Sequence, residues 1–132
     1  MGIPNETGGP GKRTVLLAER DETMQCFLVA VLQFGGHEVL VVADDQRLDD
    51  LAHPHHADVL LIRYRSTATD ESPESGLEVI RRVRRQYPDW PIIAFSASGM
   101  KDTEQKLISH GATHFLPMPF APDALLSLIQ RL

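Results

Sequence analysis

Short runs of aliphatic residues recur along the chain, and polar residues separate each run from the next. The run Val59–Ile62 consists of four consecutive aliphatic residues with no polar alternation. Such a run is typical of a strand that is covered on both faces, as in the centre of a parallel sheet. Comparable runs predict strands at residues 14–18, 38–43, 92–96 and 114–116.

Between these predicted strands, apolar residues recur at helical spacing. The fullest stripe follows the positions i, i+3, i+4, i+7 and i+8 and consists of Met24, Phe27, Leu28, Val31 and Leu32. Asp21 is suited to cap the start of this helix, and Gly35–Gly36 to end it. Further helices are predicted from Asp44 to Leu51, from about Gly76 to Tyr87, from Asp102 to His110 and from Pro122 to Leu132.

Strand and helix thus alternate five times, which favours a doubly wound α/β fold. We expect a five-stranded parallel sheet with helices on both faces. Residues 1–13 are polar and rich in glycine and proline, so we predict a disordered N-terminal tail. The remaining residues, 14–132, are then a single domain, and no second domain fits in the chain.

Charge and composition narrow the possible functions. The formal net charge of −5 argues against direct binding of nucleic acid, which depends on lysine and arginine. Cys26 is the only cysteine, so an internal disulfide is impossible and a reducing compartment is the simpler interpretation. No apolar run approaches the roughly 20 residues of a membrane span. We therefore expect a cytoplasmic protein without a membrane contact.

The candidate chemistry lies where the predicted central strand ends, at Arg63. In open α/β sheets, ligands bind at the carboxyl edge of the strands. A buried guanidinium needs a charged partner, and Glu19, which follows the first strand, is the predicted one. The alternative is a small-anion site in which Arg20, Arg63 and Arg65 bind a phosphate-bearing ligand through forked hydrogen bonds.

Several stretches carry a resemblance to a known family: VLLAERDE, GHEVLVVAD, ADVLLIR, GLEVIRRVRRQYPDWPIIAFSAS and HGATHFLPMPFAPDALLSLIQRL. Over Thr14–Leu132 the chain resembles the receiver domain of bacterial two-component response regulators. The resemblance implies a flavodoxin-like fold with five βα units, which agrees with the alternation of predicted strands and helices.

The resemblance also identifies positions of chemistry. Receivers autophosphorylate on an aspartate that ends the third strand, with Mg²⁺ held by two acids after the first strand. A serine or threonine ends the fourth strand, and a lysine precedes a proline after the fifth. In this sequence the acid pair falls on Glu19 and Arg20, the nucleophile on Arg63, the hydroxyl on Ser96 and the lysine on Met118.

Three of these five positions oppose phosphoryl transfer. Arg63 cannot be a nucleophile, because its guanidinium stays protonated. Arg20 adds positive charge where Mg²⁺ would bind, and Met118 offers no charge to a phosphoryl oxygen. The pattern resembles aspartate-less receivers, or pseudo-receivers. We therefore expect a domain that is not an enzyme, with a degenerate phosphorylation pocket and no metal or cofactor.

Two further positions are implied by the resemblance. Phe115 matches an aromatic that some receivers use as a rotameric switch, and it lacks a hydroxyl group. We expect its ring to be held inward permanently. Met118–Pro119 matches a place where receivers carry a cis peptide bond, and Pro119 is predicted to follow a cis bond here.

The same resemblance implies a contact surface. In receivers the face formed by the fourth helix, the fifth strand and the fifth helix mediates dimerisation. The last helix here is apolar nearly all round, so we expect an excess of apolar residues on that face, Leu126 or Leu128 with Ile129. The expected partner is another protein or a second copy of the chain.

The favoured function is a signalling adaptor in a phosphorelay-type pathway, which acts through protein–protein contact without being phosphorylated. One alternative is a ligand-sensing module that binds a small anion beside the arginines. The other is a receiver that is still phosphorylated, on a displaced acid such as Asp70 or Glu71 in the loop after the third strand.

Overall fold

The computed structural model describes residues 12–43, 48, 50–65, 75–97 and 101–132. Its strands are β1 (Thr14–Ala18), β2 (Glu38–Val42), β3 (Val59–Arg63), β4 (Ile92–Ser96) and β5 (His114–Pro117). Its helices with complete bounds are α1 (Glu22–Phe34), α3 (Leu77–Gln86), α4 (Lys101–His110) and α5 (Pro122–Gln130). The predicted bounds of these elements differ from the observed ones by one or two residues at most.

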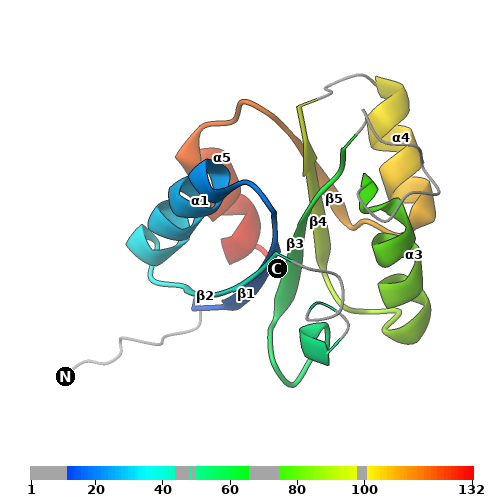
Figure 1. Cartoon of the computed structure of the whole chain (residues 1–132), viewed down its shortest axis with the longest axis horizontal. Helices are drawn as coiled ribbons and strands as arrows, with labels where there is room; N and C mark the ends of the chain where they lie inside the picture. Colours follow the sequence, from blue (N-terminus) through cyan, green and yellow to red (C-terminus); the bar gives the residue numbers. More distant parts are fainter. Residues whose placement is uncertain (1–11, 44–47, 49, 66–74, 98–100) are drawn as a thin grey trace.

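The five strands form one parallel sheet in the order β2-β1-β3-β4-β5. Helices α1 and α5 cover one face of the sheet, and α3 and α4 cover the other (Figure 1). This arrangement confirms the predicted doubly wound, flavodoxin-like fold. The predicted helix from Asp44 to Leu51 lies partly outside the described residues.

Residues of β3 are buried on both faces of the sheet, as the aliphatic run predicted. Val59 and Leu61 belong to a core cluster beneath α1 and α5, whereas Leu60 and Ile62 belong to a cluster beneath α3. The alternation of strand side chains divides one continuous run between two apolar layers. Since β3 has neighbours on both sides, its carboxyl end at Arg63 lies in the middle of the sheet edge.

A side-chain cap begins α1 shortly after the carboxyl end of β1. The Asp21 carboxylate accepts a hydrogen bond of 2.8 Å from the Met24 N–H, so Asp21 is the N-cap as predicted. On the other side of β3, Gly76 precedes α3 with φ +86°. A Cβ atom there would lie 2.5 Å from the Arg63 carbonyl oxygen, so glycine allows α3 to begin against the end of β3.

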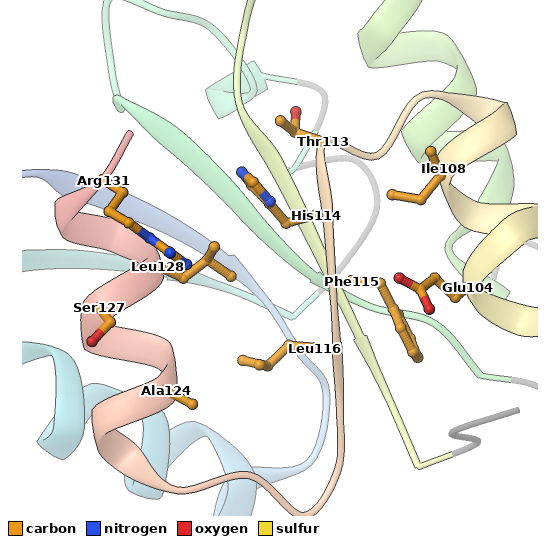
Figure 2. Close-up of a pocket in the computed structure, with 10 residues that line it drawn as sticks. All are labelled: Glu104, Ile108, Thr113, His114, Phe115, Leu116, Ala124, Ser127, Leu128 and Arg131. Atoms are coloured by element: carbon orange, nitrogen blue, oxygen red, sulfur yellow. The ribbon is translucent and has the colours of Figure 1, made fainter. Parts of the chain in front are cut away.

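Of the residues predicted to form an apolar excess on the last helix, Leu126 or Leu128 with Ile129, Ile129 is fully buried and that part of the prediction is wrong. Leu128 and Ile129 are buried, and only Leu126 is partly exposed. Leu128 points toward β5, because the side of α5 that carries it faces the sheet (Figure 2). On α1, by contrast, Phe27 was predicted to lie in the core stripe but is 40% exposed.

His37 directly precedes β2 and is buried against the end of α1. Its Nδ1 accepts a hydrogen bond of 3.0 Å from the Arg13 backbone N–H, and its Nε2 is buried without a partner among the described residues. Burial, and secondarily the positive charge of Arg13, lowers the pKa of His37 below its ordinary value of 6.5. Folding therefore favours the neutral form of His37.

Acidification is expected to destabilise the fold through His37. Between the lowered pKa of the folded chain and 6.5, the unfolded chain binds a proton at this position more readily than the folded chain, so the free energy of unfolding falls as the pH falls through that window. The slope from this residue is at most about 1.4 kcal/mol per pH unit. Urea titrations at pH 7.5 and pH 5.5 will measure it. His37→Asn, which retains an acceptor, is expected to flatten the dependence; an equal slope in both proteins would contradict this account.

Candidate functional site

The carboxyl ends of four strands bring the predicted site residues to one edge of the sheet. The parallel register pairs Ala18 with Ile62, Arg63 with Phe95 and Ser96 with Pro117. Glu19, Arg63, Ser96 and Met118 therefore follow or end neighbouring strands in one row. Sequence reasoning placed these residues together correctly, because strand ends in a parallel sheet share an edge.

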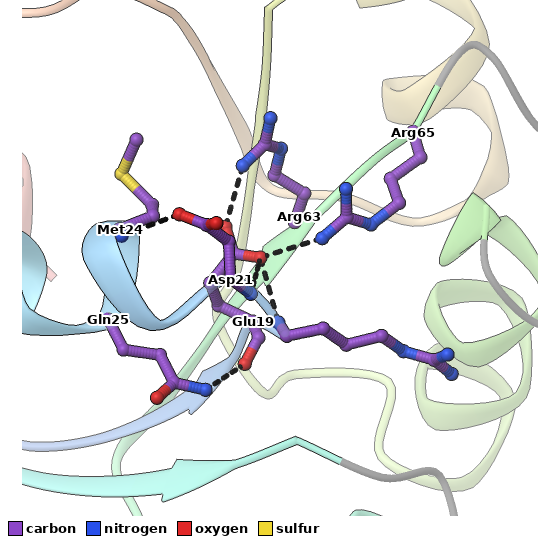
Figure 3. Close-up of polar contacts among 7 residues, drawn as sticks. Glu19, Asp21, Met24, Gln25, Arg63 and Arg65 are labelled. Carbon is purple, nitrogen blue, oxygen red and sulfur yellow. Dashed lines mark hydrogen bonds and ion pairs between the residues drawn. The ribbon is translucent and has the colours of Figure 1, made fainter.

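Glu19 is the centre of this edge, and its side chain is fully buried. Arg63 Nη1 donates to Glu19 Oε1 over 2.7 Å, and Arg65 Nη2 donates to Oε2 over 2.9 Å (Figure 3). The backbone N–H groups of Arg20 and Asp21 also donate to Oε2, at 2.8 and 3.0 Å. The predicted pair between Glu19 and Arg63 is confirmed, and Arg65 completes a three-residue ion cluster.

Further contacts hold the backbone and side chains of the ion cluster in place. The Glu19 carbonyl accepts a bond of 2.6 Å from Gln25 Nε2, which ties it to α1. The Arg65 N–H donates to the Ser75 carbonyl over 3.0 Å, so the backbone beyond β3 is held on both sides of residues 66–74. The Arg63 guanidinium lies 5.9 Å from the centre of the Phe95 ring, within the range of a cation–π contact. Each charged group therefore has a fixed neighbour.

Two guanidinium groups and one carboxylate leave the ion cluster with a net positive charge. The Arg63 and Arg65 side chains are 18% and 28% exposed, respectively, so both arginines also face solvent. Burying the Glu19 carboxylate is costly, and the two charged donors and two backbone donors offset that cost.

Ser96 and Met118 lie beside the cluster but carry no charge. Ser96 is buried, and its carbonyl accepts a bond of 2.7 Å from the Met118 N–H. The Met118 side chain is half-buried and packs against the apolar cluster that contains Phe95. The Met118–Pro119 peptide bond is cis, as predicted.

A contact between Tyr64 and Lys106 links the site edge to α4, and sequence reasoning missed it. Tyr64 stands between the two arginines of the ion cluster and is 3% exposed. Its hydroxyl lies 3.2 Å from Lys106 Nζ on α4. The Tyr64 N–H donates to the Phe95 carbonyl over 2.8 Å, which holds the Tyr64 backbone beside β4 at the end of the sheet. The one sequence signal for this contact was an aromatic residue between two charges.

The face that the resemblance implied for contacts carries an open groove of about 440 Å³ between α4, β5 and α5 (Figure 2). Glu104 and Ile108 line it from α4, and Arg131 lines it from the end of α5. Phe115 lies at its floor, half-buried against the core cluster beneath α3. The groove lining therefore mixes apolar with polar residues, and it carries an acidic side chain on α4 and a basic side chain at the end of α5.

Within the described part of the chain, no three histidine, cysteine or acidic side chains are grouped so that they could hold a metal ion. None of the described helices is long and apolar enough to cross a membrane. Asp70 and Glu71, the displaced acids of the third hypothesis, lie outside the described residues.

The domain is flavodoxin-like, because helices cover both faces of one parallel sheet. Its candidate site lies at the carboxyl edge of that sheet, where the strand-end residues form a row. Residues 15–130 match the response regulator receiver domain family. The chain therefore belongs to the receiver domains of response regulators, which act in two-component signalling.

Similar proteins agree with this assignment. The transcriptional regulator NtrC of Azospirillum brasilense is 30% identical over 118 residues, which are 89% of this chain and 24% of NtrC. The response regulator MprA of Mycolicibacterium vanbaalenii is 27% identical over 89% of this chain and 49% of MprA. The chain thus spans about a quarter to a half of these relatives.

Solved structures share the fold. The chemotaxis response regulator CheY4 of Vibrio cholerae has a TM-score of 0.74 and 27% identity over 89% of this chain and 96% of CheY4. NtrX of Brucella abortus, solved with ADP, has a TM-score of 0.78 over 91% of this chain and 26% of NtrX. At 20% identity NtrX supports the fold alone.

Proposed function

We propose that this receiver domain is a pseudo-receiver that signals by protein–protein contact without being phosphorylated. The observation that carries the proposal is the position of Arg63. It ends β3, where receivers place the phosphorylated aspartate, and it is bound to Glu19, where they place a metal-binding acid. A protonated guanidinium has no lone pair with which to attack a phosphoryl donor.

The residues of this edge also do not fit Mg²⁺. Magnesium requires carboxylate oxygens and waters in a near-octahedral arrangement. The Glu19 oxygens already accept bonds from Arg63, Arg65 and two backbone N–H groups, and the Asp21 carboxylate caps α1. We infer that the two guanidinium groups balance the buried carboxylate as a metal ion would in a phosphorylated receiver.

A domain of this kind regulates through a surface of constant shape. The groove between α4, β5 and α5 supplies that surface, and the contact between Tyr64 and Lys106 joins the end of β3 to α4. Because no phosphoryl group arrives, no ligand favours one of two states over the other. We propose that the groove is always ready to bind its protein partner, and that abundance of either protein controls the signal.

The proposal is tested by incubating the full chain with radioactive phosphoramidate and Mg²⁺. No labelled protein is expected, whereas a receiver domain that retains its aspartate, treated in parallel, is expected to be labelled. Labelling that Asp70→Asn or Glu71→Gln abolishes would instead establish the displaced-acid alternative. Labelling at any other carboxylate would also contradict the proposal.

If the groove between α4, β5 and α5 keeps one shape, the residues around it should not exchange between two conformations. Phe115 is half-buried and packs against the core at the floor of the groove, and it has no hydroxyl to draw it toward water, so the covered part of its ring gains by keeping this position. Relaxation-dispersion NMR of the full chain is expected to show no shared microsecond-to-millisecond exchange over Ser96, α4 and Phe115. Exchange of a single rate across these three places would mean a live two-state switch, and the proposal of a constant surface would fail.

The anion-sensing alternative is favoured by one observation, the partial exposure of the two guanidinium groups. A phosphate-bearing ligand would compete with Glu19 for their donors. This alternative can be tested by measuring the melting temperature in low salt while the concentration of inorganic phosphate is raised in 10-fold steps. If the adaptor proposal is correct, the melting temperature stays unchanged. A saturable rise that is lost in Arg65→Ala would support the anion site.

A further inference from the structure

β2 forms one outer edge of the sheet, and among the described strands it pairs with β1 alone (Figure 1). The Glu38 N–H and the Val42 carbonyl form hydrogen bonds of 3.0 and 3.2 Å with residues that flank β1. In a parallel ladder, every second residue turns both of its backbone polar groups toward the same neighbouring strand. Since Glu38 and Val42 turn toward β1, the N–H and C=O groups of Val39 and Val41 point toward the open edge.

The side chains of β2 leave this edge apolar on both faces of the sheet. Leu40 is 36% exposed and Val41 is 42% exposed, and consecutive strand residues point to opposite faces. From Val39 to Ala43 the sequence contains no charged residue, proline or glycine. Exposed edge strands normally carry charges, prolines or bulges that prevent another strand from pairing with them. The apolar run of β2 carries neither a charge nor a proline, so its edge is suited to pair with a further strand.

We propose that two copies of this chain pair edge to edge through β2, antiparallel to each other, so that their two sheets form one continuous sheet. A two-fold axis at Leu40 places Val39 of each copy opposite Val41 of the other. The outward N–H and C=O groups of these valines then form hydrogen bonds in both directions within each pair. This interface lies at the opposite edge of the sheet from β5, and the inference does not depend on the proposed function.

The sequence of β2 favours a second copy as the added strand. The run Val39, Leu40 and Val41 is nearly symmetric about its centre, so the pairing joins valine to valine on one face of the sheet and leucine to leucine on the other. Side chains directly opposite each other on paired strands contact and stabilise the sheet. Glu38 is bound to Lys12 over 2.9 Å, so its charge is balanced within each copy. The paired stretch is short, so we expect a weak and reversible dimer.

Sedimentation equilibrium of the full chain between 20 µM and 1 mM will test the inference. A monomer–dimer equilibrium is expected, with a Kd of about 100 µM, weaker than for interfaces of standard size. Val41→Lys is expected to weaken it by at least about 30-fold, because the charge lies at the centre of the paired edge in both copies. Ile108→Lys is the matched control, because Ile108 on α4 is also 42% exposed. This variant is expected to dimerise as the unmodified chain does.

Cysteine cross-linking gives an independent reading of the register. In a Cys26→Ser background, Leu40→Cys is expected to form a disulfide between two copies on mild oxidation. A pair at the two-fold axis that shares no hydrogen bond has Cα atoms about 4.5 Å apart, within the reach of a disulfide. Val41→Cys is the matched control, because position 41 is more exposed than position 40. The symmetry places its counterpart diagonally, about 7–8 Å away and beyond that reach, so no cross-link is expected.

Three results would overturn the inference. A chain that stays monomeric at 1 mM would leave the edge of β2 to a strand of a different protein. A dimer that Val41→Lys leaves intact would place the contact on another surface, and if Ile108→Lys dissociates it, that surface is the groove between α4, β5 and α5. A dimer that cross-links through Val41→Cys and not through Leu40→Cys would contradict the two-fold axis at Leu40.

Discussion

Replacing both Arg63 and Arg65 with alanine is expected to lower the free energy of unfolding by about 3–5 kcal/mol, the usual cost of leaving a buried charge without its partner. The Glu19 side chain is fully buried, and the double variant leaves it with only the two backbone N–H donors of Arg20 and Asp21. Urea-induced unfolding followed by circular dichroism will measure the loss.

The single variants separate the two contributions. Each is expected to cost about 1.5–3 kcal/mol, the value of a hydrogen bond to a charged group, because the other arginine still binds Glu19. Arg81→Ala is the matched control, since Arg81 pairs with Glu78 on the open surface of α3, and little change is expected. Adding Glu19→Gln to the double variant is expected to recover part of the loss by removing the stranded charge. A neutral double variant would mean that the ion cluster does not stabilise the fold.

The sequence was sufficient to predict the sheet and the first ion pair. A short aliphatic run such as Val59–Ile62 is typical of a strand buried on both faces in the middle of a parallel sheet, and together with the helical stripes between such runs it indicated the strand positions. Glu19 and Arg63 could be paired because both follow neighbouring strands, and the carboxyl ends of such strands meet. Neither inference required knowledge of side-chain conformations.

Other features depended on how the chain packs after the strands end. Arg65 lies beyond β3, where no periodicity fixes the backbone, so its bond to Glu19 could be suggested only as part of an anion site. Leu128 and Ile129 were assigned to a contact surface, but both belong to the core cluster beneath α1 and α5, and an apolar stripe alone does not show which part of it the sheet covers. Phe27 shows the converse, because it belongs to the apolar stripe of α1 but lies outside the part of the helix that the sheet covers.

We expect that phosphorylation can be restored only by substituting several residues at the carboxyl edge of the sheet together. The resulting gain in labelling is the largest effect that we predict. Arg63→Asp alone supplies a nucleophile, but Arg20 still opposes the metal and Met118 offers no ammonium. The resemblance to receivers indicates the set Arg20→Asp, Arg63→Asp and Met118→Lys. The structure adds Arg65→Ala, because Arg65 binds Glu19 Oε2 and would compete with Mg²⁺ for that oxygen.

Labelling with radioactive phosphoramidate and Mg²⁺ is therefore expected to rise in steps. The Arg63→Asp variant should remain at background, and the four-residue variant should exceed it by at least about 100-fold, the usual effect of one well-placed charge on such a reaction. The triple variant that retains Arg65 should fall between the two. The four-residue variant with Asn at position 63 is the matched control and should not be labelled. Efficient labelling of the single variant would show that Arg20 and Met118 do not block the reaction, and that Arg63 alone separates this domain from a phosphorylated receiver.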